Sequence, residues 1–298
     1  MTWAASLAAG IAVSLFLAVT LFTCQAVRPA RFAIRKTPAD DGLRFDTIRF
    51  PSRDGTPLAG WWVAAADARA TIILCHGYPS NRSDVRPLIP FLHAAGYNVL
   101  AFDFRRLGES GGRVCTIGLN EPKDLLGAVD EAAHRSGRPI GALGMSMGAA
   151  VALMSAAEEP RIRAVVADSA YASLDRMCRR RWSALPGVLS RPAGSYSNWL
   201  GARLVGRSLS GASPFRAVAA IAPRPILFIH ARRDALIPCS DSEELFHAAP
   251  GPKDLWITSA SGHVRSWSEE TDEYQRRVLA FFEGSLSPQR HKDTKNNS

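Results

Sequence analysis

Apolar and polar residues follow two different patterns along this chain. Residues 43–50 and 60–65 alternate between apolar and polar side chains, on either side of the turn residues Asp54-Gly55. This alternation predicts an antiparallel strand pair at the edge of a sheet. Later runs are apolar throughout, which is typical of parallel strands that are covered on both faces. These runs are 71–74, 99–102, 140–143, 164–167 and 226–229.

Helical patterns separate these runs and complete an α/β order. They occupy 84–95, 121–136, 146–157 and 239–248, and a last strand and helix follow over 254–258 and 266–282. Alternating strands and helices predict a doubly wound sheet with right-handed crossovers. We therefore expect one α/β domain over 43–284. Residues 285–298 are polar and charged, so we expect a disordered tail there.

One stretch interrupts this order. Residues 172–213 are too many for a simple connection between a strand and a helix, so we predict a small helical cap inserted above the sheet. The segment 171–217 holds eight arginines against one aspartate, a net charge of +7 within the +9 of the chain. No nucleic-acid-binding motif accompanies them, so we expect no nucleic-acid partner. Two interpretations stay open, a face towards anionic lipid headgroups and a solvated arginine-rich helix.

The N-terminal segment predicts a membrane anchor. Residues 1–27 carry no charged side chain, and about 20 apolar residues in a helix cross a bilayer core of roughly 30 Å. No Lys or Arg precedes the apolar run, whereas a basic linker over 28–42 follows it. A secretory signal usually begins with positive charge, so this order favours an uncleaved anchor. The positive-inside rule then places the domain that follows the anchor in the cytoplasm.

Two alternatives to the anchor stay open, a cleaved secretory signal and a lipoprotein signal ending at Cys24. Bulky Phe22 stands where a lipoprotein signal needs a small residue, which disfavours that alternative. The five cysteines have no paired spacing, so we predict neither a disulfide framework nor a zinc site. Unpaired cysteines agree with a domain in the cytoplasm.

The strongest local signal is the stretch Gly144-Met145-Ser146-Met147-Gly148. A GxSxG string alone is weak evidence in a chain with 23 glycines. Here it follows a predicted strand and opens a predicted helix, which is the context of a nucleophile elbow. We therefore predict that Ser146 is a nucleophile at the start of a helix, where the helix dipole favours developing negative charge.

A serine nucleophile needs a base and an acid that orients the base. Of the seven histidines, His263 lies in the loop between the last predicted strand and the last predicted helix. Asp234 follows the strand at 226–229. This gives the chain order Ser, Asp, His, which is the order found where the nucleophile lies in such an elbow. Asp168, after the preceding strand, is the alternative acid. We predict a catalytic triad of Ser146, Asp234 and His263.

Two backbone N–H groups are expected to form an oxyanion hole. Met147 follows the nucleophile directly, and Tyr78 lies in the turn after the strand at 71–74. Such donors stabilise the negative oxygen of a tetrahedral intermediate, and losing one typically costs ~10²–10³ in rate. Gly77 permits the tight turn, and we expect His76 to be structural rather than catalytic.

Several motifs in this order resemble the α/β-hydrolase superfamily over about 44–282. They are His76-Gly77-Tyr78, Asp103-Phe104-Arg105, Gly108-Glu109-Ser110, the elbow at Ser146, Asp234 with Ile237-Pro238, and Gly262-His263. The resemblance is greatest to the membrane-anchored Bem46-like and serine-aminopeptidase-like branch. It implies an eight-stranded, mostly parallel sheet flanked by helices, and a reaction without cofactor or metal. Relatives often have Gly where this chain has Arg106.

The resemblance also implies a reaction class. Members of the superfamily include esterases, thioesterases, acylglycerol lipases and a few peptidases, and Ser146 argues against the branches that use an Asp nucleophile. We expect a serine hydrolase acting on a carboxylic ester or thioester, with a small-molecule or lipid-like acyl substrate at the membrane. A short-chain esterase, a peptidase and an acyltransferase are alternatives on the same triad. A non-catalytic binding protein is disfavoured because no triad member is missing.

Overall fold

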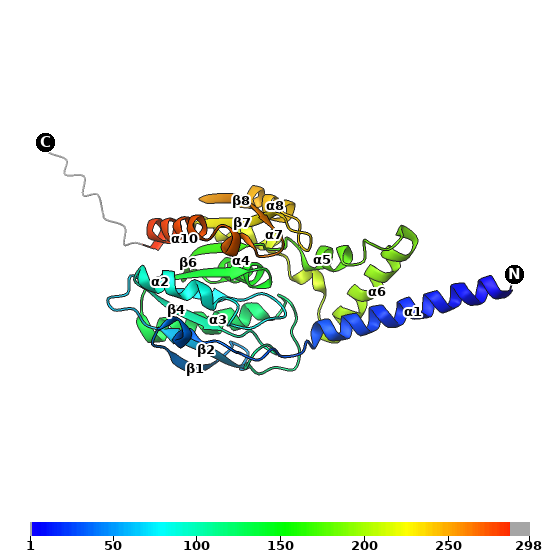
Figure 1. The fold of residues 1–298 in the computed structure, drawn as a ribbon, viewed down its shortest axis with the longest axis horizontal. Helices are drawn as coiled ribbons and strands as arrows, with labels where there is room; N and C mark the ends of the chain where they lie inside the picture. The colour runs from blue at the N-terminus through cyan, green and yellow to red at the C-terminus, as the bar shows by residue number, and fades with distance from the viewer. Residues whose placement is uncertain (1, 287–298) are drawn as a thin grey trace.

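A sheet of eight strands forms the centre of the protein, in a computed structural model that describes residues 2–286 (Figure 1). Its strands lie in the order β1-β2-β4-β3-β5-β6-β7-β8. They are β1 (Asp46–Pro51), β2 (Pro57–Val63), β3 (Ala70–Cys75), β4 (Tyr97–Phe102), β5 (Ile140–Met145), β6 (Ile162–Asp168), β7 (Ile226–Arg233) and β8 (Lys253–Ser261). The β1–β2 and β2–β4 pairs are antiparallel, and the five other pairs are parallel. The expected eight-stranded, mostly parallel sheet is confirmed.

Helices cover both faces of this sheet and close two apolar cores. On one face, α3 (Glu121–Ser136), α4 (Met147–Glu158) and α8 (Ser240–Ala248) pack against the strands. On the other face lie α2 (Ile89–Ala94) and α10 (Thr271–Leu286). The central strands β3, β4 and β5 are buried along their whole length, which explains their uniformly apolar sequences. The sheet is therefore a rigid support for the loops at its carboxyl edge.

The structure corrects three boundaries. The helix expected over 84–95 is a short 3-10 turn (Arg86–Leu88) followed by α2, with a proline near the start of each element. The helix expected over 266–282 is broken between α9 (Ser266–Glu269) and α10, where the Glu270 carboxylate accepts hydrogen bonds from Ser259. Helix α10 continues to Leu286, beyond the expected end of the domain, because Leu286 is buried in the second core. The rest of the expected tail lies outside the described residues.

The stretch that follows β6 contains mainly helices. They are α5 (Leu174–Arg180), α6 (Gly187–Val205), the 3-10 turn Leu209–Gly211, α7 (Pro214–Ala217) and the 3-10 turn Val218–Ile221. Three of its arginines pair with carboxylates: Arg176 with Glu244, Arg180 with Asp241, and Arg179 with Asp175. Two of these acids belong to α8, so part of the positive charge is neutralised within the fold.

Helix α1 (Thr2–Val27) projects from the body of the molecule, and α6 leans against it (Figure 1). Its segment Ala5–Val27 is long and apolar enough to cross a membrane. A signal sequence has the same length and composition. The structure adds that the C-terminal half of α1 is in contact with α6, so α1 is not detached from the domain.

Candidate active site

The turn between β5 and α4 places Ser146 at the carboxyl edge of the sheet. Ser146 has φ 54° and ψ −116°, a strained conformation of the kind that concentrates at active sites. Its backbone N–H donates to the Asp168 carbonyl at 2.8 Å, which ties the turn to β6. A Cβ at Gly148 would overlap the backbone of Cys75, and one at Gly144 would overlap the backbone of Gly148. The two glycines are therefore required by the close packing of strand, turn and helix.

His263 lies between Ser146 and Asp234 and is within hydrogen-bond distance of both. The Ser146 hydroxyl donates to His263 Nε2 at 2.7 Å, and His263 Nδ1 donates to Asp234 Oδ2 at 2.6 Å. The His263 side chain is 21 % exposed, whereas the Asp234 side chain is fully buried. Loops after β5, β7 and β8 thus bring the three predicted triad residues together.

The Asp234 carboxylate is the most heavily hydrogen-bonded group of the site. Its Oδ1 accepts the backbone N–H groups of Leu236 at 2.8 Å and Ile237 at 3.0 Å, while its Oδ2 accepts from His263. Burial alone would raise the pKa of Asp234, but hydrogen bonds from His230 and His263 hold that pKa well below its usual value. Asp234 is therefore ionised over the whole neutral range, as the orienting acid of a triad must be.

His230, which the sequence did not mark as a site residue, lies next to this carboxylate. His230 Nε2 is 3.3 Å from Asp234 Oδ2 and 2.9 Å from the Ile237 carbonyl oxygen, and Nδ1 is 2.7 Å from the Ser242 hydroxyl. The imidazole is fully buried at the end of β7. A histidine at the end of an apolar strand was the only sequence signal, and it did not reveal the contact with Asp234.

The alternative acid, Asp168, occupies a different environment. It is fully buried, and its Oδ1 accepts a hydrogen bond from the Ser169 hydroxyl at 2.9 Å. Its Oδ2 has no hydrogen-bond partner among the described residues. Burial raises the pKa of Asp168 to about 6. No hydrogen bond joins Asp168 to His263 in the described part of the chain, so the geometry favours Asp234 as the partner of the imidazole.

The two expected oxyanion donors lie on either side of Ser146. Met147 is the first residue of α4, and Tyr78 follows Gly77 in the loop after β3. A Cβ at Gly77 would be 3.3 Å from the Ser146 Cβ, so this loop passes directly beside the serine. Within residues 2–286, neither the Tyr78 nor the Met147 N–H donates to a protein acceptor. Both donors are thus available to a ligand atom.

The remaining motif residues support the loops at the carboxyl edge of the sheet, which form its rim. His76 is fully buried; its Nδ1 donates to the Gly77 carbonyl at 2.8 Å and its Nε2 accepts the Phe104 N–H at 3.1 Å. Burial lowers the pKa of His76, so the ring is neutral. The Arg82 guanidinium pairs with Asp103 and, at 2.5 Å, with Glu109. These contacts fix the loops after β3 and β4.

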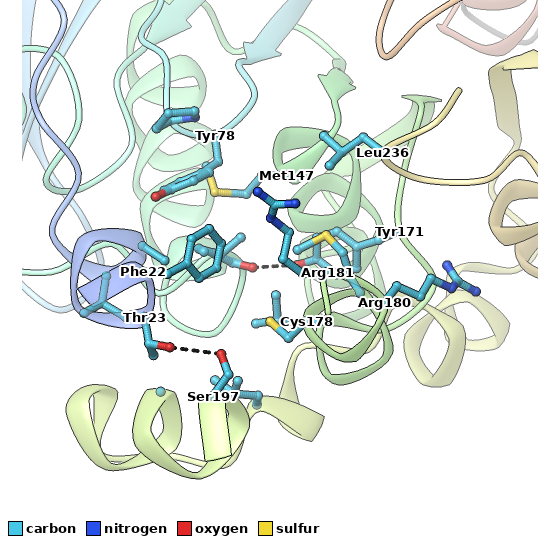
Figure 2. A pocket seen from close by; sticks show the side chains of 18 of the residues that line it. Phe22, Thr23, Tyr78, Met147, Tyr171, Cys178, Arg180, Arg181, Ser197 and Leu236 are labelled. Carbon is cyan, nitrogen blue, oxygen red and sulfur yellow. Dashed lines mark hydrogen bonds between the residues drawn. The ribbon is translucent and has the colours of Figure 1, made fainter. Parts of the chain in front are cut away.

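Ser146 lines two cavities. The larger has a volume of about 1210 Å³, beyond the ~300–1,000 Å³ of most ligand pockets, and is bounded by the rim, α5, α6 and α1 (Figure 2). The smaller, of about 600 Å³, lies between Gly77-Tyr78 and the segment His263–Ser268.

Arg106, which stands where relatives often have Gly, has φ 68° and lines the larger cavity. In residues 2–286, no cluster of His, Cys, Asp or Glu is arranged to hold a metal ion.

Comparison with known proteins identifies the class to which this fold and site belong. Residues 70–219 match the family described as having the alpha/beta hydrolase fold. The chain belongs to this family.

Curated relatives and a solved structure match most of the chain. YfhR of Escherichia coli strain K12 is 30% identical over 255 residues, which are 82% of each protein. YqkD of Bacillus subtilis strain 168 is 31% identical over 237 residues, 78% of this chain and 77% of YqkD. Both are described as uncharacterized. The esterase Pf2001 of Pyrococcus furiosus is 31% identical, has a TM-score of 0.72, and covers 87% of this chain and 100% of its own. The fold and its close structural similarity to an esterase are therefore shown.

Proposed function

We propose that this protein is a serine hydrolase that cleaves carboxylic ester or thioester bonds through an acyl-enzyme intermediate. The observation that carries the proposal is the chain of two short hydrogen bonds, from the Ser146 hydroxyl to His263 and from His263 to Asp234. In this arrangement the imidazole takes the serine proton, and the carboxylate stabilises the imidazolium that forms. The likeness to esterase Pf2001 supports the same reaction class.

The reaction begins with attack of the Ser146 Oγ on the carbonyl carbon, as its proton passes to His263 Nε2. The carbonyl π electrons move to the oxygen, and the Tyr78 and Met147 N–H groups stabilise that oxyanion. The oxyanion then reforms the carbonyl and expels the alcohol or thiol, which takes the proton from His263. Water attacks the acyl-enzyme with His263 as base, and the carboxylic acid leaves Ser146.

The two cavities that Ser146 lines fit the two parts of such a substrate. The larger is lined by apolar groups such as Phe22, Ile117 and Leu209, which suits an acyl chain. The smaller includes Asp84 and Arg265, which suits a polar leaving group. Residues 172–213 serve as the cap of the larger cavity. We therefore infer a lipid-like acyl substrate.

The apolar helix α1 supports action at a membrane. We infer that residues 1–27 anchor the protein, that 28–42 form a basic linker, and that the catalytic domain faces the cytoplasm, because basic residues follow the span and none precedes it. Within the family, this architecture is that of the membrane-anchored Bem46-like and serine-aminopeptidase-like branch.

Hydrolysis of a panel of acyl esters, acyl thioesters and peptides by the full-length protein tests the proposal. We expect cleavage of esters or thioesters, and a loss of about 10⁴-fold or more in kcat for Ser146→Ala. Ser155→Ala, on the same helix but outside both cavities, is the matched control and should keep full activity. Cleavage of peptides alone, or ester cleavage that survives Ser146→Ala, would contradict the proposal.

A further inference from the structure

The last turns of α1 form part of the catalytic cavity. Phe22, Thr23, Ala26 and Val27 line the same cavity as Ser146. Figure 2 shows Phe22 and Thr23 reaching from α1 into the space between Tyr78 and Met147 on the rim and Ser197 on α6. A helix that served only as a tether would need a flexible linker and no contact with the site.

Polar contacts hold α1 on the cap. The Thr23 and Ser197 hydroxyls are 3.0 Å apart in a buried contact, and the Thr20 and Tyr196 hydroxyls are also 3.0 Å apart. The rings of Phe16 and Tyr196 lie 4.8 Å apart. Hydrogen bonds between hydroxyl groups of neighbouring helices help to hold the helices together in an apolar surrounding. Helix α1 therefore packs on α6 in one defined register.

The apolar pattern of α1 agrees with this packing. Val19, Thr23 and Val27 are buried and recur every fourth residue, so they form one stripe along the helix. Outside this stripe most of the helix is exposed, including Leu17 and Leu21. One face of α1 thus contacts the cap, and the other faces are left for a bilayer.

The chain after α1 is fixed to the rim of the sheet. The Cys115 N–H donates to the Val27 carbonyl at 2.9 Å, and the Arg31 guanidinium donates to the Gly108 carbonyl at 2.9 Å. The Asn81 amide donates to the Phe32 carbonyl at 2.9 Å. The end of α1 is therefore held by the cap on one side and by the rim on the other, with the cavity between them.

We propose that the C-terminal turns of α1 form a wall of the acyl-chain site, so that a long acyl chain lies between α1 and the cap. This deepens the proposed function and rests on it. An acyl chain that moves out of the bilayer along α1 passes Phe22 and the Arg181 guanidinium, which lies over the Phe22 ring at 5.2 Å, before its carbonyl reaches Ser146. The substrate class is thus a long-chain acyl ester or thioester drawn from the membrane, and α1 is a specificity determinant as well as an anchor.

The cap carries a feature that fits this route. Tyr196 and Trp199 on α6 stack with ring centroids 5.9 Å apart, and Trp199 is 59 % exposed beside α1. Tyr and Trp are enriched where a protein meets the membrane surface. Helix α6 therefore offers an aromatic contact to the membrane next to the wall that α1 provides.

Chain-length selectivity of the full-length protein in detergent micelles tests this proposal. Ala26→Trp adds bulk to the wall, and Ala18→Trp makes the same change on an exposed part of α1 outside the cavity. For Ala26→Trp, kcat/KM for p-nitrophenyl palmitate should fall by roughly tenfold or more, while that for p-nitrophenyl acetate changes by less than about twofold. Ala18→Trp should leave both values unchanged.

Phe22→Ala gives a second reading that does not depend on added bulk. This substitution removes an aromatic ring that lines the cavity. Phe22 is 37 % exposed, so the fold should survive its loss. The KM for p-nitrophenyl palmitate should rise, while the KM for p-nitrophenyl acetate stays constant. The proposal that α1 forms a wall of the acyl-chain site would be overturned if the kinetic constants for palmitate were unchanged in both Ala26→Trp and Phe22→Ala. Equal losses for the two esters would also overturn it. If the unmodified protein cleaves esters in a Ser146-dependent way in that case, the hydrolase function stands alone. If it cleaves neither esters nor thioesters, both proposals fail.

Discussion

The rim of the sheet and the cap above it are held by different forces. At the rim, backbone hydrogen bonds fix two of the reacting groups: Ser146 through its N–H to β6, and Asp234 through two N–H groups of its own loop. The cap packs on the rim through an apolar cluster, forms ion pairs with α8 and contacts α1, and it leaves Val188 and Trp199 largely exposed. In the proposed function, the rim therefore determines which bond is broken, and the cap with α1 determines which molecule is admitted.

The largest expected effect separates two carboxylates at the rim. Asp234→Asn should lower kcat by roughly 10⁴-fold, because an amide cannot hold the imidazole in the tautomer that accepts the serine proton. Asp168→Asn makes the same change on a carboxylate without a hydrogen bond to His263 in the described residues, and should lower kcat by less than about tenfold. Steady-state kinetics on one ester decide, and a larger loss for Asp168→Asn would reverse the assignment.

The next effect contrasts one glycine of the rim with one of the cap. Gly148→Ala places a methyl group against the backbone of Cys75, which cannot yield, and should destabilise the fold by about 3 kcal/mol or more. Gly187→Ala, at the start of α6, meets no atom within 4 Å and should change stability by at most about 1 kcal/mol, in the stabilising direction. Urea denaturation measures both, and similar losses would show that the cap is packed as tightly as the rim.

The pH dependence of stability gives a third test at the rim. The pKa of Asp168 is about 6 in the fold against 3.8 for an unperturbed aspartate, so between these values the unfolded chain loses its proton first. Stability should fall as pH rises from about 4 to 6, and the loss through this group reaches at most roughly 3 kcal/mol. Asp168→Asn should abolish that part of the slope in unfolding experiments. Equal slopes in both proteins would place the carboxyl in a more polar environment.

The smallest effect concerns the contact between α1 and the cap. In a double-mutant cycle, Thr23→Val and Ser197→Ala should each destabilise the protein, with a coupling energy of about 0.5–1.5 kcal/mol, because both remove the same hydrogen bond. Thermal unfolding of the four proteins in one detergent measures this energy. Strict additivity would mean that α1 and α6 do not form this contact, and the two regions would then be independent.

Local sequence patterns were sufficient for the framework of this fold. Strands such as β5 are uniformly apolar because both faces are buried, and the order of Ser146, Asp234 and His263 follows the order of the strands that carry them. The break at Glu270 was missed because it depends on side-chain contacts with β8, which leave no local pattern.

Two side-chain contacts around the cavities, one between residues four apart and one across most of the chain, were the other part that the sequence did not reveal. His230 contacts Asp234 only because the loop after β7 folds back over it, and Thr23 contacts Ser197 across most of the chain. An apolar N-terminal run predicts a membrane segment from composition alone. It carries no signal that one end of that helix will line the cavity at Ser146.

Covalent labelling of the full-length protein with a fluorophosphonate, followed by peptide mapping, tests the central claim most directly. We expect a single major adduct on Ser146, abolished by Ser146→Ala and formed at least about 100-fold more slowly in His263→Ala, since the base no longer accepts the proton. An adduct on another serine, or labelling of Ser146 at an unchanged rate without His263, would contradict it.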